Sequence, residues 1–330
     1  MTMIDDILSL PGQLRWGTGL DIDPLRTGGP IVLLGMGGSA MAATVATLAA
    51  SPRAPIVVHR GYGLPEWAAD SGAAVIAVSY SGNTEEVLSG VDAAITEGLS
   101  IAAVASGGRL GEIARDRGLP YAEVPGGLQP RAGVGYQTAA VAATLCAAGQ
   151  ISNVDRALNE AADTVEGLVG GGDGGAFVLG RDIAGGLADR TAVIYGGRGV
   201  GSTAAYRWKT QINENAKVPA FSGTVPEMNH NELEGWRAGA SDDFGIVYLR
   251  DSEEHPAVAR RLDLSGTVLS GCVPRVGEVR SAGFGPLARF YSLAVVGDIT
   301  SVYMAEEAGV DPTPVETLEE FKIMLAKGTP

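Results

Sequence analysis

The sequence predicts an α/β protein built from two doubly wound parallel-sheet subdomains in tandem. Short apolar, β-branched runs that end on glycine or hydroxyl residues are typical of buried parallel strands. Segments of helical composition alternate with these runs, as they do in doubly wound sheets. The alternation is interrupted by a glycine-rich stretch and then starts again, so the second half of the chain reads as a weaker copy of the first.

The first half of the chain supplies the clearest elements. The run IVLLG at 31–35 is fully apolar and ends on glycine, and AAVIAVSY at 73–80 leads directly into a hydroxyl-rich turn. Both patterns favour strands that feed into helices. The expected strands are 31–35, 55–59, 73–80, 101–106 and 121–125, and the expected helices are 40–50, 84–98 and 135–148.

The second half repeats this order of elements. VGGGDGGA at 169–176 has the most flexible composition in the chain and lies near the join between the halves. TAVIYGGRGVGST at 191–203 again reads as strand, glycine loop, small hydroxyl residues and helix, and FGIVYLRDSEEH at 244–255 echoes VIAVSYSGNTEE. We therefore expect one subdomain over 1–152 and a second over 153–330.

Composition and charge exclude several classes of protein. The 24 basic and 38 acidic residues give a net charge of −14, which disfavours a general nucleic-acid or anionic-membrane surface. The two cysteines, Cys146 and Cys272, lie far apart and predict neither a disulfide framework nor a cysteine metal site. The amino-terminal segment carries acids where a signal peptide needs positive charge, and no apolar run is long enough to span a bilayer, so we expect a cytoplasmic protein.

The turn SYSGNTEE places three hydroxyl groups, those of Ser79, Ser81 and Thr84, at the start of a helix. A helix amino terminus presents unpaired N–H groups and a partial positive charge, and the hydroxyls together with Gly82 suit a phosphate. Helix capping and turn formation account for the same residues equally well. The second copy carries acids at the corresponding place, so only the first copy is expected to hold an anion.

A second glycine-rich turn, GMGGSAM at 35–41, follows the first strand and contains Gly38 and Ser39. A dinucleotide fold requires a third glycine and an acid about 20 residues further on. This turn has alanine at the third glycine position, and the second strand ends in His59, followed by Arg60. A nicotinamide cofactor is therefore disfavoured, and together with the hydroxyl turn the segment resembles one wall of a sugar-phosphate pocket.

Four charged or titratable residues are candidates for chemistry. Arg131 stands among glycines ahead of a helix, where it can polarise a substrate oxygen or be an ordinary surface arginine. Glu214, near the end of an amphipathic helix, and His230, sixteen residues later, are the pair suited to proton transfer on a sugar, although a lone helical glutamate is usually solvated. HNELE does not match the zinc motif HExxH, so no metal is expected. Lys322 lies beside an apolar stripe of the final helix, where most lysines are simply exposed.

Together these segments resemble the bifunctional phosphoglucose/phosphomannose isomerases of the sugar isomerase (SIS) domain superfamily. The blocks that carry the resemblance occur in the family's order from about 35 to 322: GMGGSA, VSYSGNTEE, ASGG followed by Arg109, PRAGVGY, RWKTQINENAKVPA and PEMNHNELEGW. The hydroxyl turn is general to SIS domains, whereas the block with Glu214 and His230 is specific to this family. The resemblance implies two SIS-type, flavodoxin-like subdomains.

The resemblance also implies a reaction and the residues that carry it. The reaction is metal-free interconversion of glucose 6-phosphate or mannose 6-phosphate with fructose 6-phosphate, with no cofactor. Glu214 is the implied base between C1 and C2, Arg131 steadies the enediolate, and His230 and Lys322 assist ring opening. The implied phosphate-binding residues are Gly38, Ser39, Ser79, Ser81 and Thr84. The active site of the family lies at a homodimer interface, and the histidine comes from the neighbouring subunit.

Two other classes of function remain as alternatives. A non-catalytic SIS protein that binds a sugar phosphate and regulates a partner is one, but no basic helix-turn-helix pattern accompanies the domains here. An NADP-dependent reductase is the other, and the glycine turn gives it little support.

Overall fold

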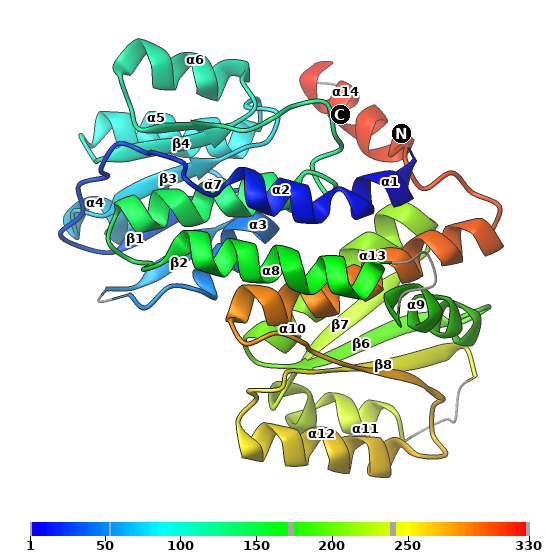
Figure 1. Cartoon of the computed structure of the whole chain (residues 1–330). Helices are drawn as coiled ribbons and strands as arrows, with labels where there is room; N and C mark the ends of the chain where they lie inside the picture. The colour runs from blue at the N-terminus through cyan, green and yellow to red at the C-terminus, as the bar shows by residue number, and fades with distance from the viewer. Residues whose placement is uncertain (1, 53, 171–174, 238–241, 328–330) are drawn as a thin grey trace.

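The structure is a computed structural model that describes residues 2–52, 54–170, 175–237 and 242–327. Figure 1 shows two α/β lobes, with the long helices α8 and α13 running between them. The amino-terminal elements are α1 (Met3–Leu8), α2 (Leu10–Trp16), β1 (Ile31–Leu34), α3 (Gly37–Thr47), β2 (Ile56–His59), α4 (Trp67–Asp70), β3 (Ala74–Val78), α5 (Glu85–Thr96), β4 (Ile101–Ala105), α6 (Gly108–Arg117), β5 (Tyr121–Glu123) and α7 (Val134–Ala147).

The carboxyl-terminal elements follow the same alternation and then end in two helices. They are α8 (Val154–Val169), α9 (Gly175–Gly186), β6 (Thr191–Gly197), α10 (Val200–Gln211), a π-helical turn (Ile212–Ala216), β7 (Ala220–Val225), a 3₁₀ turn (Glu227–His230), α11 (Glu232–Gly235), β8 (Phe244–Arg250), α12 (Pro256–Leu269), β9 (Arg275–Arg280), α13 (Pro286–Glu307) and α14 (Glu316–Lys327).

The first sheet is parallel, with strand order β2-β1-β3-β4-β5. Every residue of β1, β3 and β4 is buried. This burial explains why these strands read as unbroken apolar runs, because helices cover both faces of a doubly wound parallel sheet. All five strands expected in this half are confirmed within two residues at either end.

The second sheet has the order β7-β6-β8-β9 and is also parallel. The chain enters a central strand, crosses to one edge, returns to the other side of that strand and moves outward, which is the path of the first four strands of the first sheet. The order of strands therefore supports the internal repeat, and the predicted fold class of two doubly wound α/β units is confirmed.

One hydrophobic core joins the two units. It takes residues from α1, α2 and α3 of the first half and from α10 and α13 of the second. Trp208 of α10 is fully buried and its indole Nε1 donates to the carbonyl of Leu293 at 2.8 Å. Gly297 lets α13 approach this indole, since a Cβ there would lie 2.4 Å from the ring atoms. This close contact packs α10 tightly against α13 within the second half, and residues of α1, α2 and α3 pack into the same core.

The boundary expected at residues 152 and 153 falls between α7 and α8, and it stays a prediction. Of the glycine-rich stretch expected near the join, residues 171–174 lie outside the described part of the chain. Among the described helices, none is both long enough and apolar enough to cross a membrane.

Candidate functional site

The turns that follow β1 and β3 are joined by the hydroxyl group of Ser39. This buried hydroxyl donates to the side-chain oxygen of Gln137 at 2.7 Å and accepts the backbone N–H of Tyr80 at 3.1 Å. Both turns lie at the carboxyl edge of the first sheet, where α/β proteins bind ligands. The glycine turn and the hydroxyl turn therefore form one continuous surface.

The hydroxyls of the second turn do not cap the helix behind them. Thr84 is the N-cap residue of α5, but its hydroxyl pairs with that of Ser79 at 2.8 Å and makes no capping bond. Met36, the N-cap residue of α3, supplies no side-chain cap either. The amino termini of two helices, 11 and 12 residues long, therefore face this edge without a side-chain cap. The capping interpretation is wrong for Thr84, and the arrangement favours an anion.

Two glycines allow the close backbone approaches on which this surface depends. Gly82 has φ +70°, and a Cβ on it would lie 2.0 Å from the carbonyl oxygen of Gly107. A Cβ on Gly38 would lie 3.0 Å from the carbonyl oxygen of Pro130 and 3.2 Å from the amide nitrogen of Arg131. Gly38 thereby places the turn after β1 directly against the loop that carries Arg131.

Arg131 is buried and joins its own loop to two other segments, residues 214–215 and 312–313. Its Nε donates to Oδ1 of Asn215 at 2.8 Å, and its Nη2 donates to the carbonyls of Pro312 at 2.7 Å and Thr313 at 2.9 Å. Its Nη1 lies 3.5 Å from Oε2 of Glu214. Burial lowers the pKa of Arg131, and the Glu214 carboxylate works against that effect. The guanidinium remains a cation, because arginine does not lose its proton in proteins.

Glu214 lies on a π-helical turn that continues α10. π-helical turns inside α-helices are rare and are frequent at functional sites. The Glu214 side chain is 30% exposed, whereas the neighbouring Asn215 is fully buried and its Nδ2 donates to Oγ of Ser301 at 2.9 Å. The turn thus directs Glu214 toward solvent and Asn215 into α13. Of the candidate catalytic residues, the structure brings Arg131 and Glu214 together.

A cavity of about 770 Å³ opens beside Glu214. It lies between the end of α10 with the π-helical turn and the segment that leads into α14. Lys217 closes one side, and its Nζ donates to the carbonyls of Glu214 and Pro314. Burial and the nearby Arg131 lower the pKa of Lys217. The carboxyl-terminal segment is therefore held to the site by two cations, Arg131 and Lys217.

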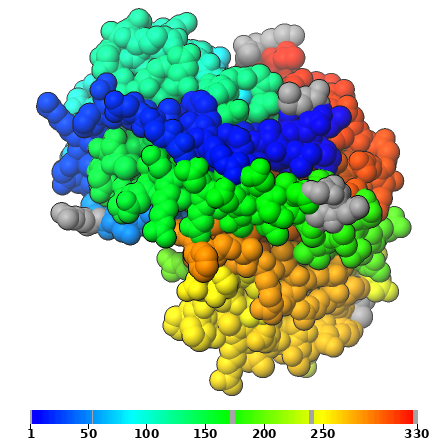
Figure 2. Space-filling view, viewed as in Figure 1, coloured from blue at the N-terminus to red at the C-terminus, as the bar shows by residue number. Residues whose placement is uncertain are grey.

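His230 and Lys322 lie away from this pair. Ile212 and Ala216, on the turn that carries Glu214, pack in the core shared by the two halves, whereas Met228, on the turn with His230, packs in a separate core. Among the contacts described, none joins either residue to Glu214 or Arg131. Both side chains are exposed. Helix α14, which carries Lys322, lies at the outer edge of the molecule (Figures 1 and 2).

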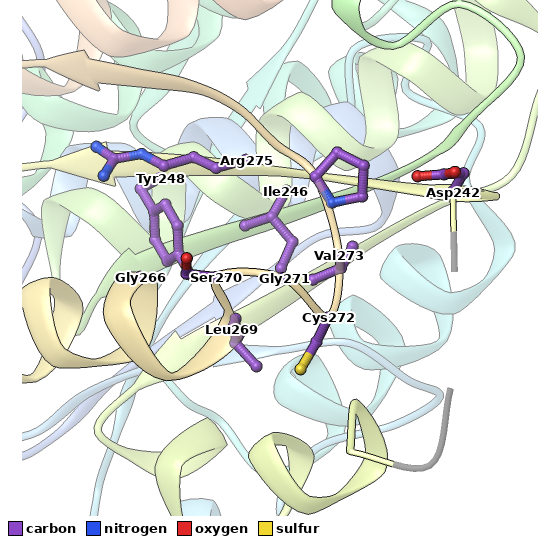
Figure 3. A pocket seen from close by; sticks show the side chains of 11 residues that line it. Asp242, Ile246, Tyr248, Gly266, Leu269, Ser270, Gly271, Cys272, Val273 and Arg275 are labelled. Carbon is purple, nitrogen blue, oxygen red and sulfur yellow. The ribbon is translucent and has the colours of Figure 1, made fainter. Parts of the chain in front are cut away.

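A second cavity, of about 470 Å³, lies at the amino ends of β8 and β9 and is shown in Figure 3. Tyr248, Cys272 and Arg275 are among its lining residues, and Arg275 packs over the Tyr248 ring at 5.5 Å. This cavity holds none of the candidate site residues. Within the described ranges, no group of three or more His, Cys, Asp or Glu side chains is placed to hold a metal ion.

Sequence reasoning missed Asn215, Gln137 and Lys217 as parts of the site. Asn215 and Lys217 sit next to the predicted base in QINENAK, so the polarity of that segment was the available signal. Gln137 lies in α7, which consists mostly of small and apolar residues, and a buried amide there indicates a specific partner.

The sequence is similar to a family model and to several known proteins. Residues 179–325 match the family model described as the bacterial phospho-glucose isomerase C-terminal SIS domain. A bifunctional phosphoglucose/phosphomannose isomerase from Caldicellulosiruptor bescii is 36% identical over 304 residues, which cover 90% of this chain and 89% of the relative. A D-glucosamine-6-phosphate 4-epimerase from Sulfolobus acidocaldarius is 32% identical over 246 residues, which cover 72% of this chain and 74% of the relative.

Solved structures show the same architecture. A putative phosphosugar isomerase from Clostridium difficile superposes with a TM-score of 0.71 at 14% identity, and the match covers 100% of this chain and 99% of the other. At that identity the likeness concerns the fold alone. With the sequence identities above, the chain belongs to the family of bifunctional phosphoglucose/phosphomannose isomerases.

Proposed function

We propose that the protein is an aldose–ketose isomerase that interconverts glucose 6-phosphate and mannose 6-phosphate with fructose 6-phosphate, without a metal ion. Family membership supports the class of reaction. The observation that supports this site is the 3.5 Å distance between Nη1 of Arg131 and Oε2 of Glu214, close to the turn with Gly38. A base and a permanent cation thereby lie close together, and the loop of the cation contacts the amino terminus of α3.

In this proposal the substrate phosphate binds at the joined turns after β1 and β3. The exposed Ser81, the Ser79–Thr84 hydroxyl pair and the amides at the start of α3 and α5 are the donors, and Ser39 holds the two turns together. Because the phosphate is not part of the reacting carbons, its binding supplies energy that orients the open-chain sugar.

The Glu214 carboxylate then removes the proton from C2 of the aldose and returns it to C1. The electron pair left by the C2–H bond forms the C1–C2 double bond, and negative charge collects on the carbonyl oxygen. Arg131 faces that oxyanion in a buried setting, where a fixed cation stabilises charge more strongly than it does in water. The C2 hydroxyl proton passes to the C1 oxygen, the C2–O bond becomes the carbonyl, and reprotonation at C1 by Glu214 gives the ketose.

Ring opening is assigned to His230 and Lys322, and the proposal includes a homodimer that places His230 of one subunit at the site of the other. The separation of His230 from Glu214 within one chain supports a shared site. So does α14, on which Leu318, Phe321 and Leu325 are 47%, 63% and 52% exposed and offer an apolar face to a partner.

The proposal also places the protein in the cytoplasm. Both cysteines are unpaired, as is usual in a reducing cytoplasm.

The test is a coupled assay with glucose 6-phosphate and mannose 6-phosphate, run with and without chelator. Glu214→Gln should lower turnover roughly 10²–10⁴-fold, because it removes the base and keeps the shape of the side chain. Glu316→Gln, an acid that lines the same cavity, is the matched control and should retain activity. Full activity of Glu214→Gln would rule out the assigned base.

The same assay separates the proposal from its alternatives. Glucosamine 6-phosphate should be included as a substrate, because one relative bears the name of a 4-epimerase for it. A protein that binds fructose 6-phosphate but converts none of the three aldose phosphates would instead be a sugar-phosphate-binding regulator.

A further inference from the structure

Asn215 occupies the position that controls the Arg131 guanidinium. It is fully buried and lies next to Glu214 on the π-helical turn. Its Oδ1 accepts from Arg131 Nε at 2.8 Å, and its Nδ2 donates to Ser301 Oγ at 2.9 Å. A buried amide with both ends engaged has one orientation and cannot rotate without breaking a bond.

The hydroxyl of Ser301 fixes which way that amide faces. It donates its own proton to the carbonyl of Asp298, one helical turn earlier on α13, at 2.6 Å. A serine hydroxyl has one proton, so its oxygen can serve Asn215 only as an acceptor. The amide must therefore present Nδ2 to Ser301 and Oδ1 to Arg131. Helix α13 thus dictates, through two side chains, where the Nε–H of Arg131 points.

We propose that Asn215 is a positioning residue, which, oriented by Ser301, holds Arg131 where its Nη1 meets the Glu214 carboxylate and its Nη2 meets the Pro312 and Thr313 carbonyls. The inference rests on the proposed function for its effect on catalysis. Nε and Nη1 of Arg131 face adjacent residues of the π-helical turn and Nη2 faces Pro312, so the bond at Nε helps to fix the plane of the whole guanidinium group. Without Asn215 the guanidinium loses its bond at Nε and can tilt about its Nη2 contacts, away from the developing oxyanion.

Asn215→Leu and Ser301→Ala test the inference on turnover. Each should lower kcat roughly 10²-fold with KM changed less than about threefold, because the cation is misplaced only for the transition state. With 2-deuterated glucose 6-phosphate, the isotope effect on kcat should rise as proton removal becomes slower. Asn215→Asp keeps an acceptor for Nε but adds a negative charge beside Arg131, so it should restore the position of Arg131 without restoring kcat.

Ser292→Ala is the matched control. Ser292 lies on the same helix, is equally buried, donates to the carbonyl of Arg289 three residues earlier and accepts one N–H, from Ala282. It thus has the bonding pattern of Ser301 but is remote from Arg131. Its variant should keep kcat and the isotope effect unchanged, and equal losses in Ser292→Ala and Ser301→Ala would overturn the inference.

A readout without substrate separates this inference from the proposed function. In a ¹H–¹⁵N spectrum of arginine side chains, the Arg131 Nε–H, identified by its loss in Arg131→Lys, should exchange slowly in the native protein. In Asn215→Leu and Ser301→Ala this signal should exchange fast or broaden, while the thermal midpoint is followed separately. An unchanged Arg131 signal in both variants refutes the positioning role. A wild-type protein that isomerises no hexose phosphate refutes the proposed function alone.

Discussion

Asp298→Asn should destabilise the protein far more than its small chemical change suggests. Asp298 and Arg207 form a buried pair, with side chains 3% and 4% exposed and two bonds of 3.0 and 2.8 Å. The variant leaves the Arg207 charge buried without its counter-ion, which typically costs about 3–5 kcal/mol. An unfolding entropy of about 2.1 cal/mol/K per residue over 330 residues converts this cost into a fall of about 4–7 °C in Tm.

Calorimetry of three proteins checks the reasoning: the wild type, Asp298→Asn, and the double variant Arg207→Met, Asp298→Leu. The double variant removes both charges, so it should recover most of the lost stability. It should not recover activity, because Nη2 of Arg207 also donates to the backbone carbonyl of Arg131 at 3.1 Å. A double variant as unstable as Asp298→Asn would show that a lone buried charge is not the cause.

Two further predictions concern the site turn and the second cavity. Gly82→Ala should lower the free energy of unfolding by about 1–3 kcal/mol and lower kcat/KM, because the residue has φ +70° and its Cβ would press on Gly107. The control is Gly12→Ala, at an open position in α2, which should be neutral or slightly stabilising in thermal melts. Tyr248→Phe should raise stability, since the Tyr248 hydroxyl is buried without a hydrogen-bond partner among the described residues. Burial raises the pKa of Tyr248 to about 12, so this tyrosine ionises first in the unfolded chain as the pH rises above about 10. In denaturant titrations the wild type should therefore lose stability relative to the variant between about pH 10 and 12. The same dependence of stability on pH in the two proteins would contradict this assignment.

The sequence was a good guide to strands buried on both faces and to the edges of the first sheet, and a poor one to the edges of the second sheet. β1, β3 and β4 are recognisable because each residue is apolar. The edge strands β7, AFSGTV, and β9, RVGEVR, were not predicted, because each contains polar residues that face solvent. Strand propensity is weakest where only one side of a strand is paired and packed.

The individual residues of the candidate site could be predicted from the sequence, but the contacts between them could not. The hydroxyl turn stands out because several hydroxyl residues follow one apolar run, and that signal is local. The contact between Arg131 and Glu214 spans 83 residues, and no local pattern contains it. The π-helical turn was equally hidden, because INENA has the composition of an ordinary helix end. The roles of His230 and Lys322 stay predictions.

The wide turn at Ile212–Ala216 has a consequence for how the family can vary. Relative to an α-helix it accommodates one more residue per turn, and each residue of a helix advances its side chain by about 100°. A single-residue deletion there would restore regular winding, so the side chains within the turn would move around the axis by up to about that angle, while those beyond it would keep their direction. The acid and the amide could then no longer face solvent and α13, respectively. Insertions and deletions should therefore be excluded from these five residues, even where the preceding turns of α10 tolerate many substitutions.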